Sequence, residues 1–427
     1  MQKNEEKDGK ASGFVGLGID ERILSILTKN GIIEPTLIQR KSIPSAIKGH
    51  DLMGVAQTGT GKTFAFGIPL VQSLLCSRGR ALVLLPTREL ANQVEENLKK
   101  IAGGLGMRTI SIIGGEAFNR QLFSLKRNPN IIVATPGRLL DHIRRRTIRL
   151  DDISFLVLDE ADMMFDMGFA PQIEELIKLI PTTRQTLLFS ATMPAVIIKL
   201  AEKYLKTPLQ IQVAPSGSTV DLIDQEIYLI KSEEKFKNLI KILGDYRKLV
   251  LIFVRTRYGA SALCKRLNDN GFKSVEIHSN LSFNQRKKSL QDFKDASSRI
   301  MVATDVAARG LDINDIQLVL NYDLPDNSED YVHRIGRTAR AGKGGKAITF
   351  SLSNQIRSIQ KIERLIKKNL PIRRMSLDGG LVDRTNKEGG NNSGNSSRGT
   401  GNNRGSNKKF FTKKPKGRSG NFNRRRR

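Results

Sequence analysis

The stretch Ala56–Thr63, a glycine-containing loop that ends in Gly-Lys-Thr, places the strongest constraint on the fold of this chain. It follows the apolar run 52–55 and precedes the mostly apolar run 64–69, so we expect a strand, a tight loop and a helix. Small residues let backbone N–H groups curl around an anion, and the start of the helix adds its positive dipole end. Lys62 would reach the β- and γ-phosphates of a nucleotide, and the Thr63 hydroxyl would bind Mg²⁺. The stretch therefore predicts a phosphate-binding loop, with a glycine-rich turn that binds nothing as the alternative.

Short apolar runs that end in polar residues recur along the chain and predict two parallel sheets. Uninterrupted apolar runs are typical of parallel strands that helices cover on both faces. The runs in the first half are 81–85, 109–113, 131–134, 155–158 and 186–189. The corresponding, mostly apolar segments in the second half are 249–254, 275–277, 299–303, 317–320 and 347–350. The polar residues after the runs should meet at one edge of each sheet, where ligands bind in such folds.

The second half has no Gly-Lys-Thr loop, so it must contribute to a nucleotide site from across a cleft. We therefore expect an α/β protein with two tandem domains, 14–212 and 223–373, joined by a linker at 213–222. Residues 1–13 are charged and lack an apolar period, and we expect them to be disordered.

Residues 374–427 are expected to form a disordered basic tail rich in Gly, Asn, Ser, Arg and Lys. From Gly379 onward there are 14 Lys and Arg residues against 2 Asp and Glu residues. Three phenylalanines are interspersed among these cations, and this composition suits single-stranded nucleic acid. The alternative is a tail that only increases solubility.

The whole chain carries a net charge of +29, from 71 Lys and Arg against 42 Asp and Glu, which indicates a polyanionic partner. Nucleic acid is the first expectation, and the alternatives are a solvated basic surface and a membrane surface. No apolar run approaches the length of a transmembrane helix, and the first ten residues lack a signal-peptide core. Cys76 and Cys264 have neither disulfide-framework nor zinc spacing. These features predict a cytoplasmic protein that has no membrane partner.

Two further groups of residues suit phosphate hydrolysis. Asp159 and Glu160 follow an apolar run, so Asp159 could hold Mg²⁺ and Glu160 could deprotonate the attacking water. The alternative is two carboxylates that cap a helix. Arg337 and Arg340 would share a helical face and could act as arginine fingers at the γ-phosphate. The alternative is a basic patch that contacts RNA directly.

Nine motifs in this order resemble those of the DEAD-box ATP-dependent RNA helicases, most closely the bacterial RhlE-type members. The resemblance covers about Phe14 to Arg373, and Ala56 is normal for this family. Ala339 and Phe165 stand where many members have Gly and Leu. The motifs are Pro35–Gln39 with Phe14 upstream, Ala56–Thr63, Pro86–Leu90, Gly114-Gly115, Thr135–Arg138, Asp159–Asp162, Ser190–Thr192, Ala303–Ile313 and His333–Arg340.

The resemblance implies two RecA-like domains, with ATP and Mg²⁺ in the cleft between them and RNA lying across both. The implied nucleotide-binding residues are Phe14, Thr36, Gln39, Ala56, Gln57, Thr58, Gly59, Thr60, Gly61, Lys62, Thr63 and Asp312. Phe14 would stack on the adenine, Thr36 and Gln39 would read its edge, and Asp312 would contact the ribose. The implied catalytic residues are Lys62, Asp159, Glu160, Arg337 and Arg340, with Thr63 and Asp159 at the metal. The implied RNA-binding residues are Arg88, Gly115, Thr135, Arg138, Arg255 and Thr304, and the implied interdomain coupling residues are Asp162, Ser190, Thr192, His333 and Arg334.

The resemblance implies an RNA-dependent ATPase that locally unwinds short RNA duplexes or remodels ribonucleoproteins. Contacts to phosphates and 2′-hydroxyls carry little base information, so we expect little sequence specificity. Ribosomal or mRNA-decay assemblies are possible partners. Two other classes remain open: an ATP-driven DNA translocase, and a non-enzymatic RNA-binding or annealing protein that acts through its basic tail.

Overall fold

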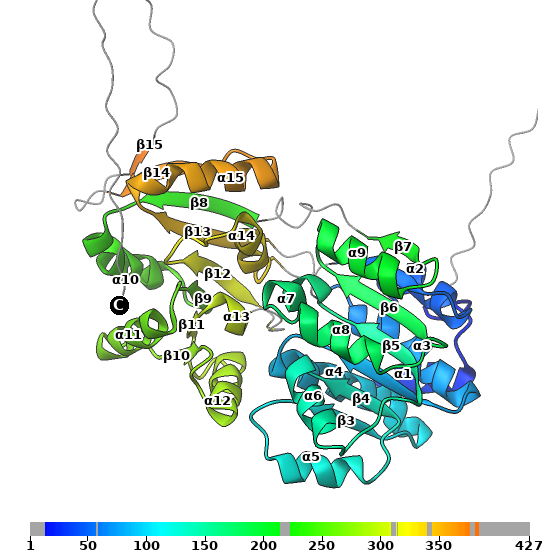
Figure 1. Ribbon diagram of the computed structural model, residues 1–427. Helices are drawn as coiled ribbons and strands as arrows, with labels where there is room; N and C mark the ends of the chain where they lie inside the picture. The colour runs from blue at the N-terminus through cyan, green and yellow to red at the C-terminus, as the bar shows by residue number, and fades with distance from the viewer. Residues whose placement is uncertain are drawn as a thin grey trace, which may run out of the picture. The chain divides into compact units, whose positions relative to one another are not determined.

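The computed structural model describes residues 13–56, 59–213, 223–308, 313, 315–339, 344–375 and 381–383. These residues form two sheets, and each sheet with its helices makes one lobe (Figure 1). Most of the predicted disordered N-terminus, of the linker and of the tail lies outside the described residues. Within the described part of the chain, no helix has the length and apolar character needed to span a membrane.

The first lobe contains a seven-stranded sheet, in which all neighbouring strands are parallel, in the order β3-β4-β2-β5-β6-β1-β7. The strands are β1 (Leu52–Val55), β2 (Arg80–Leu84), β3 (Thr109–Ile112), β4 (Ile131–Ala134), β5 (Ile153–Leu158), β6 (Gln185–Ser190) and β7 (Leu209–Gln212). The helices are α1 (Glu21–Lys29), α2 (Leu37–Ile47), α3 (Lys62–Cys76), α4 (Arg88–Ala102), α5 (Phe118–Leu125), α6 (Pro136–Arg144), α7 (Ala161–Asp166), α8 (Ala170–Lys178) and α9 (Ala195–Tyr204), with a 3₁₀ turn at Gly103–Leu105.

Alternate residues of the central strands pack into two hydrophobic cores, one on each face of the first sheet. On β2, Ala81 and Val83 join the core formed with α3 and α4. Leu82 and Leu84 join the other core, formed with α6, α8 and α9. Because both faces are buried, most positions of such a strand are apolar, and this explains the apolar runs.

The second lobe contains an eight-stranded sheet in the order β10-β11-β9-β12-β13-β8-β14-β15. The strands are β8 (Ile223–Leu229), β9 (Leu249–Phe253), β10 (Ser274–Ile277), β11 (Ile300–Ala303), β12 (Ile316–Asn321), β13 (Gly345–Ser351), β14 (Ile372–Met375) and β15 (Leu381–Asp383). The helices are α10 (Lys235–Asp245), α11 (Arg257–Asp269), α12 (Phe283–Lys294), α13 (Asp305–Ala308), α14 (Ser328–Ile335) and α15 (Ile356–Ile366), with 3₁₀ turns at Ser232–Glu234 and Ser353–Gln355. Two sheets whose strands are parallel except at β15, each flanked by helices, confirm the predicted tandem α/β architecture.

The last two strands extend the second sheet beyond residue 373, where the sequence predicted that the folded domain ends. β14 pairs in parallel with β8, and Ile372 packs against the buried cluster that contains Ile227. β15 pairs antiparallel with β14. Pairing at a sheet edge uses backbone N–H and C=O groups, so a short strand can join it without a core of its own. The strands therefore extend further than the predicted boundary of the tail.

Candidate active site and nucleic-acid interface

The loop between β1 and α3 has a backbone shape that suits an anion. Gly59 and Gly61 have φ of 88° and 90°, in the left-handed region that glycine adopts without strain. α3 begins at Lys62, so the free N–H groups of its first turn lie at the end of the loop. Gln57 and Thr58, also predicted to contact nucleotide, lie outside the described residues.

A buried ion-pair cluster joins this loop to the end of β5. Lys62 Nζ donates to Glu160 Oε1 at 2.7 Å and lies 3.8 Å from Asp159 Oδ1. Burial alone would lower the pKa of Lys62, but the Glu160 and Asp159 carboxylates outweigh it and raise that pKa. Burial also raises the pKa of Asp159 to about 7, against the opposing effect of Lys62. The fold thus brings together the three catalytic residues that the sequence predicted in the first lobe.

Glu160 has a backbone conformation that is rare for a residue with a side chain. Its φ is 53°, in the left-handed region, and it immediately precedes α7. Its N–H donates to Asp159 Oδ1 at 3.0 Å. Non-glycine residues in such conformations persist only where surrounding contacts hold them, and they cluster at functional sites. This turn allows two adjacent carboxylates to lie beside the same lysine.

The predicted coupling residues of the first lobe form one hydrogen-bonded group. Thr192 donates to Asp162 Oδ2 through both its backbone N–H and its hydroxyl, each at 2.8 Å. The Asp162 N–H donates to Ser190 Oγ at 3.1 Å. Burial would raise the pKa of Asp162, but nearby Lys62 and the Thr192 hydrogen bonds are among the influences that lower it. The turn after β6 is therefore tied directly to the acidic motif after β5.

The predicted adenine-reading residues are engaged with the phosphate-binding loop. The Thr36 N–H donates to Gln39 Oε1 and Gln39 Nε2 donates to the Gly61 carbonyl, both at 2.9 Å. A Cβ on Gly61 would lie 2.5 Å from Gln39 Nε2, so this close approach requires glycine. Phe14 is only 4% exposed and belongs to the core beside α3. Its stacking on adenine stays a prediction.

Arg88 and Gly115, both predicted to bind RNA, lie against each other. A Cβ on Gly115 would meet Arg88 Nη1 at 2.3 Å, and Gly115 has φ of 82°. Both conditions favour glycine at this position. The loop after β3 and the start of α4 therefore form one surface at the carboxyl edge of the first sheet.

Arg138 is held by a residue that sequence reasoning did not identify. Its Nε donates to Gln121 Oε1 and its Nη2 donates to the Glu116 carbonyl, each at 2.9 Å. Gln121 is buried on α5, where its Nε2 donates to the Ile113 carbonyl at 2.8 Å. Gln121 therefore links the loop that carries Gly115 to the helix that carries Arg138. The contact joins residues 17 apart in sequence, so no local pattern could have revealed it.

His142 completes this group and is fully buried beneath it. Its Nε2 lies 3.0 Å from Gln121 Oε1, its Nδ1 lies 2.8 Å from Thr147 Oγ1, and its ring stacks on Phe118 at a centroid distance of 4.2 Å. Burial and the positive charge of Arg138 lower its pKa to about 4. The ring is therefore neutral at physiological pH, with Nε2–H as the donor to the Gln121 amide oxygen.

The lowered pKa of His142 predicts that acid destabilises the first lobe. The folded-state pKa lies below the ordinary value of 6.5, so the unfolded chain takes up this proton more readily as the pH falls. The stabilising contribution is complete above about pH 6.5, and by pH 5 about 2 kcal/mol of it should be lost. Denaturant unfolding at pH 7.5 and pH 5 measures this loss. In the His142→Asn variant the difference between the two pH values should shrink by that amount, and an unchanged difference would contradict the assignment.

In the second lobe, Arg334 organises the ends of the central strands. Its Nε and Nη2 donate to the two carboxylate oxygens of Asp305 at 2.5 and 2.7 Å, and its Nη1 donates to the Asp323 carbonyl at 2.6 Å. The side chain is 2% exposed. These contacts tie α13 to the end of β12 within the lobe, and a role between domains stays a prediction for Arg334 and for His333.

Arg255 and Thr304 lie at the same edge of the second sheet. Arg255 follows β9, where its Nη2 donates to the Leu324 carbonyl and its Nε pairs with Asp326, both at 3.3 Å. Thr304 follows β11, and its N–H donates to the Ile277 carbonyl at 3.3 Å. The predicted RNA-binding residues of this lobe thus share the carboxyl edge of its sheet.

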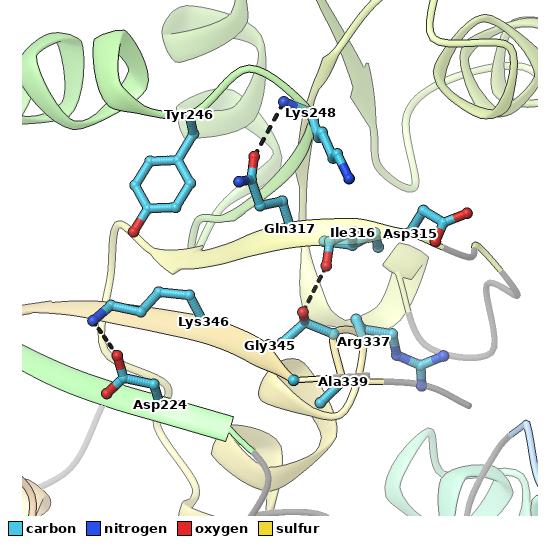
Figure 2. Close-up of a pocket in the computed structure, with 12 residues that line it drawn as sticks. Asp224, Tyr246, Lys248, Asp315, Ile316, Gln317, Arg337, Ala339, Gly345 and Lys346 are labelled. Atoms are coloured by element: carbon cyan, nitrogen blue, oxygen red, sulfur yellow. Dashed lines mark hydrogen bonds and ion pairs between the residues drawn. The ribbon is translucent and has the colours of Figure 1, made fainter. Parts of the chain in front are cut away.

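Arg337 lines a pocket of about 440 Å³ at the amino ends of β8, β12 and β13 (Figure 2). It is 6% exposed and its Nε donates to the His333 carbonyl at 3.4 Å. Two other cations, Lys248 and Lys346, line the pocket, and Lys346 pairs with Asp224 at 2.5 Å. The other two residues predicted to face the nucleotide from this lobe, Arg340 and Asp312, lie outside the described residues.

The donors at the predicted Mg²⁺ position suit that ion only together with phosphate oxygens and water. Among the described residues, no three or more His, Cys, Asp or Glu side chains group as a metal site. The first lobe offers one carboxylate, from Asp159, and one hydroxyl, from Thr63 at the start of α3. Mg²⁺ commonly takes one or two protein oxygens and completes its octahedron with phosphates and water. These residues therefore fit the ion when nucleotide is bound.

Comparison with known proteins places these motifs in a family context. The family model described as DEAD/DEAH box helicase matches residues 36–200, and the model described as helicase conserved C-terminal domain matches residues 234–342. The ATP-dependent RNA helicase CshA of Listeria monocytogenes is 44% identical over 360 residues, which cover 84% of this chain and 69% of that protein. The DEAD-box ATP-dependent RNA helicase CshA of Geobacillus kaustophilus is 43% identical, covering 84% of this chain and 77% of that protein.

Solved structures agree in fold over most of the chain. Dbp5 of S. cerevisiae bound to RNA and ADP BeF3 has a TM-score of 0.77 and 30% identity, covering 86% of this chain and 96% of that chain. Mss116p bound to ssRNA and AMP-PNP has a TM-score of 0.78 and 29% identity, covering 87% of this chain and 81% of that chain.

Proposed function

Because the chain belongs to the DEAD/DEAH box helicase family and is an ATP-dependent RNA helicase, we propose that ATP places its triphosphate at the loop 56–63. The observation that carries this proposal is the buried contact of Lys62 with Glu160 at 2.7 Å. Phosphate oxygens would replace the carboxylate as the partner of Lys62. Glu160 would then be free to accept a proton from the attacking water. Thr63 and Asp159 would hold Mg²⁺, whose charge offsets that of the phosphates.

The second lobe would complete the reaction. Arg337 and Arg340 would stabilise the charge that develops on the γ-phosphate, as arginine fingers do, and Asp312 would contact the ribose. Phe14, Thr36 and Gln39 would recognise the adenine. Gln39 already donates to the Gly61 carbonyl, so binding of adenine to Gln39 would alter a contact of the phosphate-binding loop.

RNA would bind along the carboxyl edges of the two sheets. The lobe-one residues are Arg88, Gly115, Thr135 and Arg138, and the lobe-two residues are Arg255 and Thr304. Their backbone-directed contacts would favour RNA through its 2′-hydroxyls and would read little sequence. ATP and RNA together would favour a closed arrangement of the lobes through contacts made only there. Strain on the bound strand would then release its partner strand from a short duplex.

The two domains would be 14–212 and 223–373, with β14 and β15 continuing the sheet of the second one. The basic tail would tether RNA, and the protein would act in the cytoplasm. Ribosomal or mRNA-decay assemblies would be its targets. The relatives above are named CshA, which does not support the RhlE-type subgroup that the sequence suggested.

The choice of nucleic acid is tested by ATPase assays with single strands of matched sequence. RNA should stimulate ATP hydrolysis, whereas the corresponding DNA should stimulate it far less because it lacks 2′-hydroxyls. Comparable stimulation by both strands would favour a DNA translocase. Equal hydrolysis with and without RNA would contradict the proposed coupling between the RNA and nucleotide sites.

A further inference from the structure

One helix of the first lobe, α5, turns a single phenylalanine to the solvent. Phe123 is 60% exposed, whereas Gln121 and Leu125 on the opposite face of the helix are buried. An isolated exposed apolar residue needs no explanation by itself. The surroundings of Phe123 are nevertheless unusual for a solvent-exposed ring, because the charged groups near it are almost all positive.

One guanidinium contacts the ring, and two further arginines lie on or near the same helix. The Arg127 guanidinium lies 4.7 Å from the ring centroid, in the geometry of a cation–π contact. Arg120, three residues before Phe123, lies on the same exposed face of the helix. Arg108 donates through Nη1 to the Arg127 carbonyl at 2.7 Å, which brings a third guanidinium to the end of the helix. Glu116 is the one acidic residue between positions 108 and 130, and it accepts from Gln121 Nε2 at 3.1 Å.

We infer that this face of α5, defined by Arg108, Arg120, Phe123 and Arg127, binds single-stranded RNA by stacking one base on Phe123. A flat aromatic ring supplies a stacking surface for any base, and the guanidinium groups attract the flanking phosphates. Both features are needed for strand binding without sequence preference, and α5 carries both on one exposed face. The inference rests on the proposed function, to which it adds a contact outside the motifs.

The position of α5 supports this partner over others. The helix starts three residues after Gly115, and Gln121 on its buried side holds Arg138, so a strand bound at those residues passes beside it. Along the helix, Phe118 and Phe123 are about 8 Å apart, so Phe123 lies close to the loop that carries Gly115. A membrane surface would need a broad apolar face on the helix, whereas one outward phenylalanine offers none.

The chain contains no tryptophan, which allows a direct test. In Phe123→Trp the new indole is the sole tryptophan, and stacking of a base should quench its emission. A long oligouridylate added without ATP should quench it, whereas heparin, a polyanion without bases, should not. The matched control is Leu179→Trp, at an exposed position of the same lobe that is 46% accessible, and its emission should not respond to RNA. The inference would be overturned if the emission of Phe123→Trp responded equally to oligouridylate and heparin, or did not respond to oligouridylate at all.

A second measurement uses the full-length protein in steady-state ATPase assays. Phe123→Ala should raise the KM for oligouridylate roughly fivefold or more, because one base loses its stacking partner. Phe123→Trp should restore the KM to the wild-type value, which loss of fold or charge would not predict. An unchanged KM in Phe123→Ala would reject the RNA contact. If the wild-type protein shows no RNA-stimulated hydrolysis, the proposed function fails. If RNA stimulates hydrolysis but does not change the emission of Phe123→Trp, the stacking inference alone fails.

Discussion

Replacing Glu160 by Gln should slow ATP hydrolysis by about two to four orders of magnitude, the contribution expected of a positioned general base. The amide keeps the shape of the carboxylate, and its oxygen can still accept the hydrogen bond from Lys62 Nζ that Glu160 accepts at 2.7 Å. The amide cannot take a proton from water, and the substitution also removes the negative charge that pairs with Lys62. Binding of ATP and RNA should therefore persist, and the complex with both should be long-lived.

The measurement is single-turnover ATP hydrolysis at saturating RNA, with nucleotide affinity followed separately by a fluorescent ATP analogue. Glu174→Gln is a matched control, since that glutamate lies on α8 of the same lobe and pairs at 3.4 Å with Lys203 on the surface. It should hydrolyse ATP like the wild type. Because Glu160 is buried beside Lys62 and Asp159, a thermal melt of each variant must show that the lobe still folds. An unchanged hydrolysis rate in Glu160→Gln would remove Glu160 from the role of base.

The positions of most motif residues could be predicted because the fold has one simple rule. Parallel strands carry their carboxyl ends to a common edge, so polar residues that follow apolar runs must meet there. Asp159 after β5, Ser190 at the end of β6 and Thr304 after β11 illustrate it. The apolar runs themselves could be recognised because helices bury both faces of each sheet, which leaves few positions for polar residues.

Contacts between side chains distant in sequence could not be predicted in this way. Gln121 bridges Arg138 and the Ile113 carbonyl, although nothing in the spacing of α5 distinguishes it from a surface glutamine. The hydrogen bonds of Arg334 to Asp305 and to the Asp323 carbonyl within the second lobe were likewise not predicted from its motif, and its coupling role stays a prediction. The hydrogen-bond partners of these side chains depend on which helix packs beside which strand end. The hydrophobic periodicity of the sequence carries no information on that packing.

The strands β14 and β15 could not be predicted for a different reason. Composition predicts whether a segment can bury enough apolar surface to fold alone, and residues after 373 cannot. A short edge strand needs no core of its own, because its backbone pairs with the exposed edge of an existing sheet. β14 does this against β8, and β15 against β14.

Replacing Arg337 by Ala should reduce the rate of RNA-stimulated hydrolysis by about 10³-fold or more, the effect found when arginine fingers are removed. Arg337 follows α14 and is only 6% exposed. Its Nε donates to the His333 carbonyl at 3.4 Å, so the side chain is restrained. A guanidinium restrained in this way needs little reorganisation when charge develops on a phosphate. Arg337→Lys should recover only part of the rate, since an ammonium keeps the charge but lacks the planar fork.

The same variant decides between the two interpretations of this arginine. If Arg337 acts on the γ-phosphate, the loss should lie in kcat while the KM for RNA changes little. If it belongs to a basic RNA-binding patch, the KM for RNA should rise and kcat at saturating RNA should survive. Arg364→Ala, on the exposed side of α15 in the same lobe, removes an equal charge and should leave kcat unchanged. A kcat for Arg337→Ala equal to that control would place the arginine outside the reaction, because a transition-state contact cannot be removed without a cost in rate.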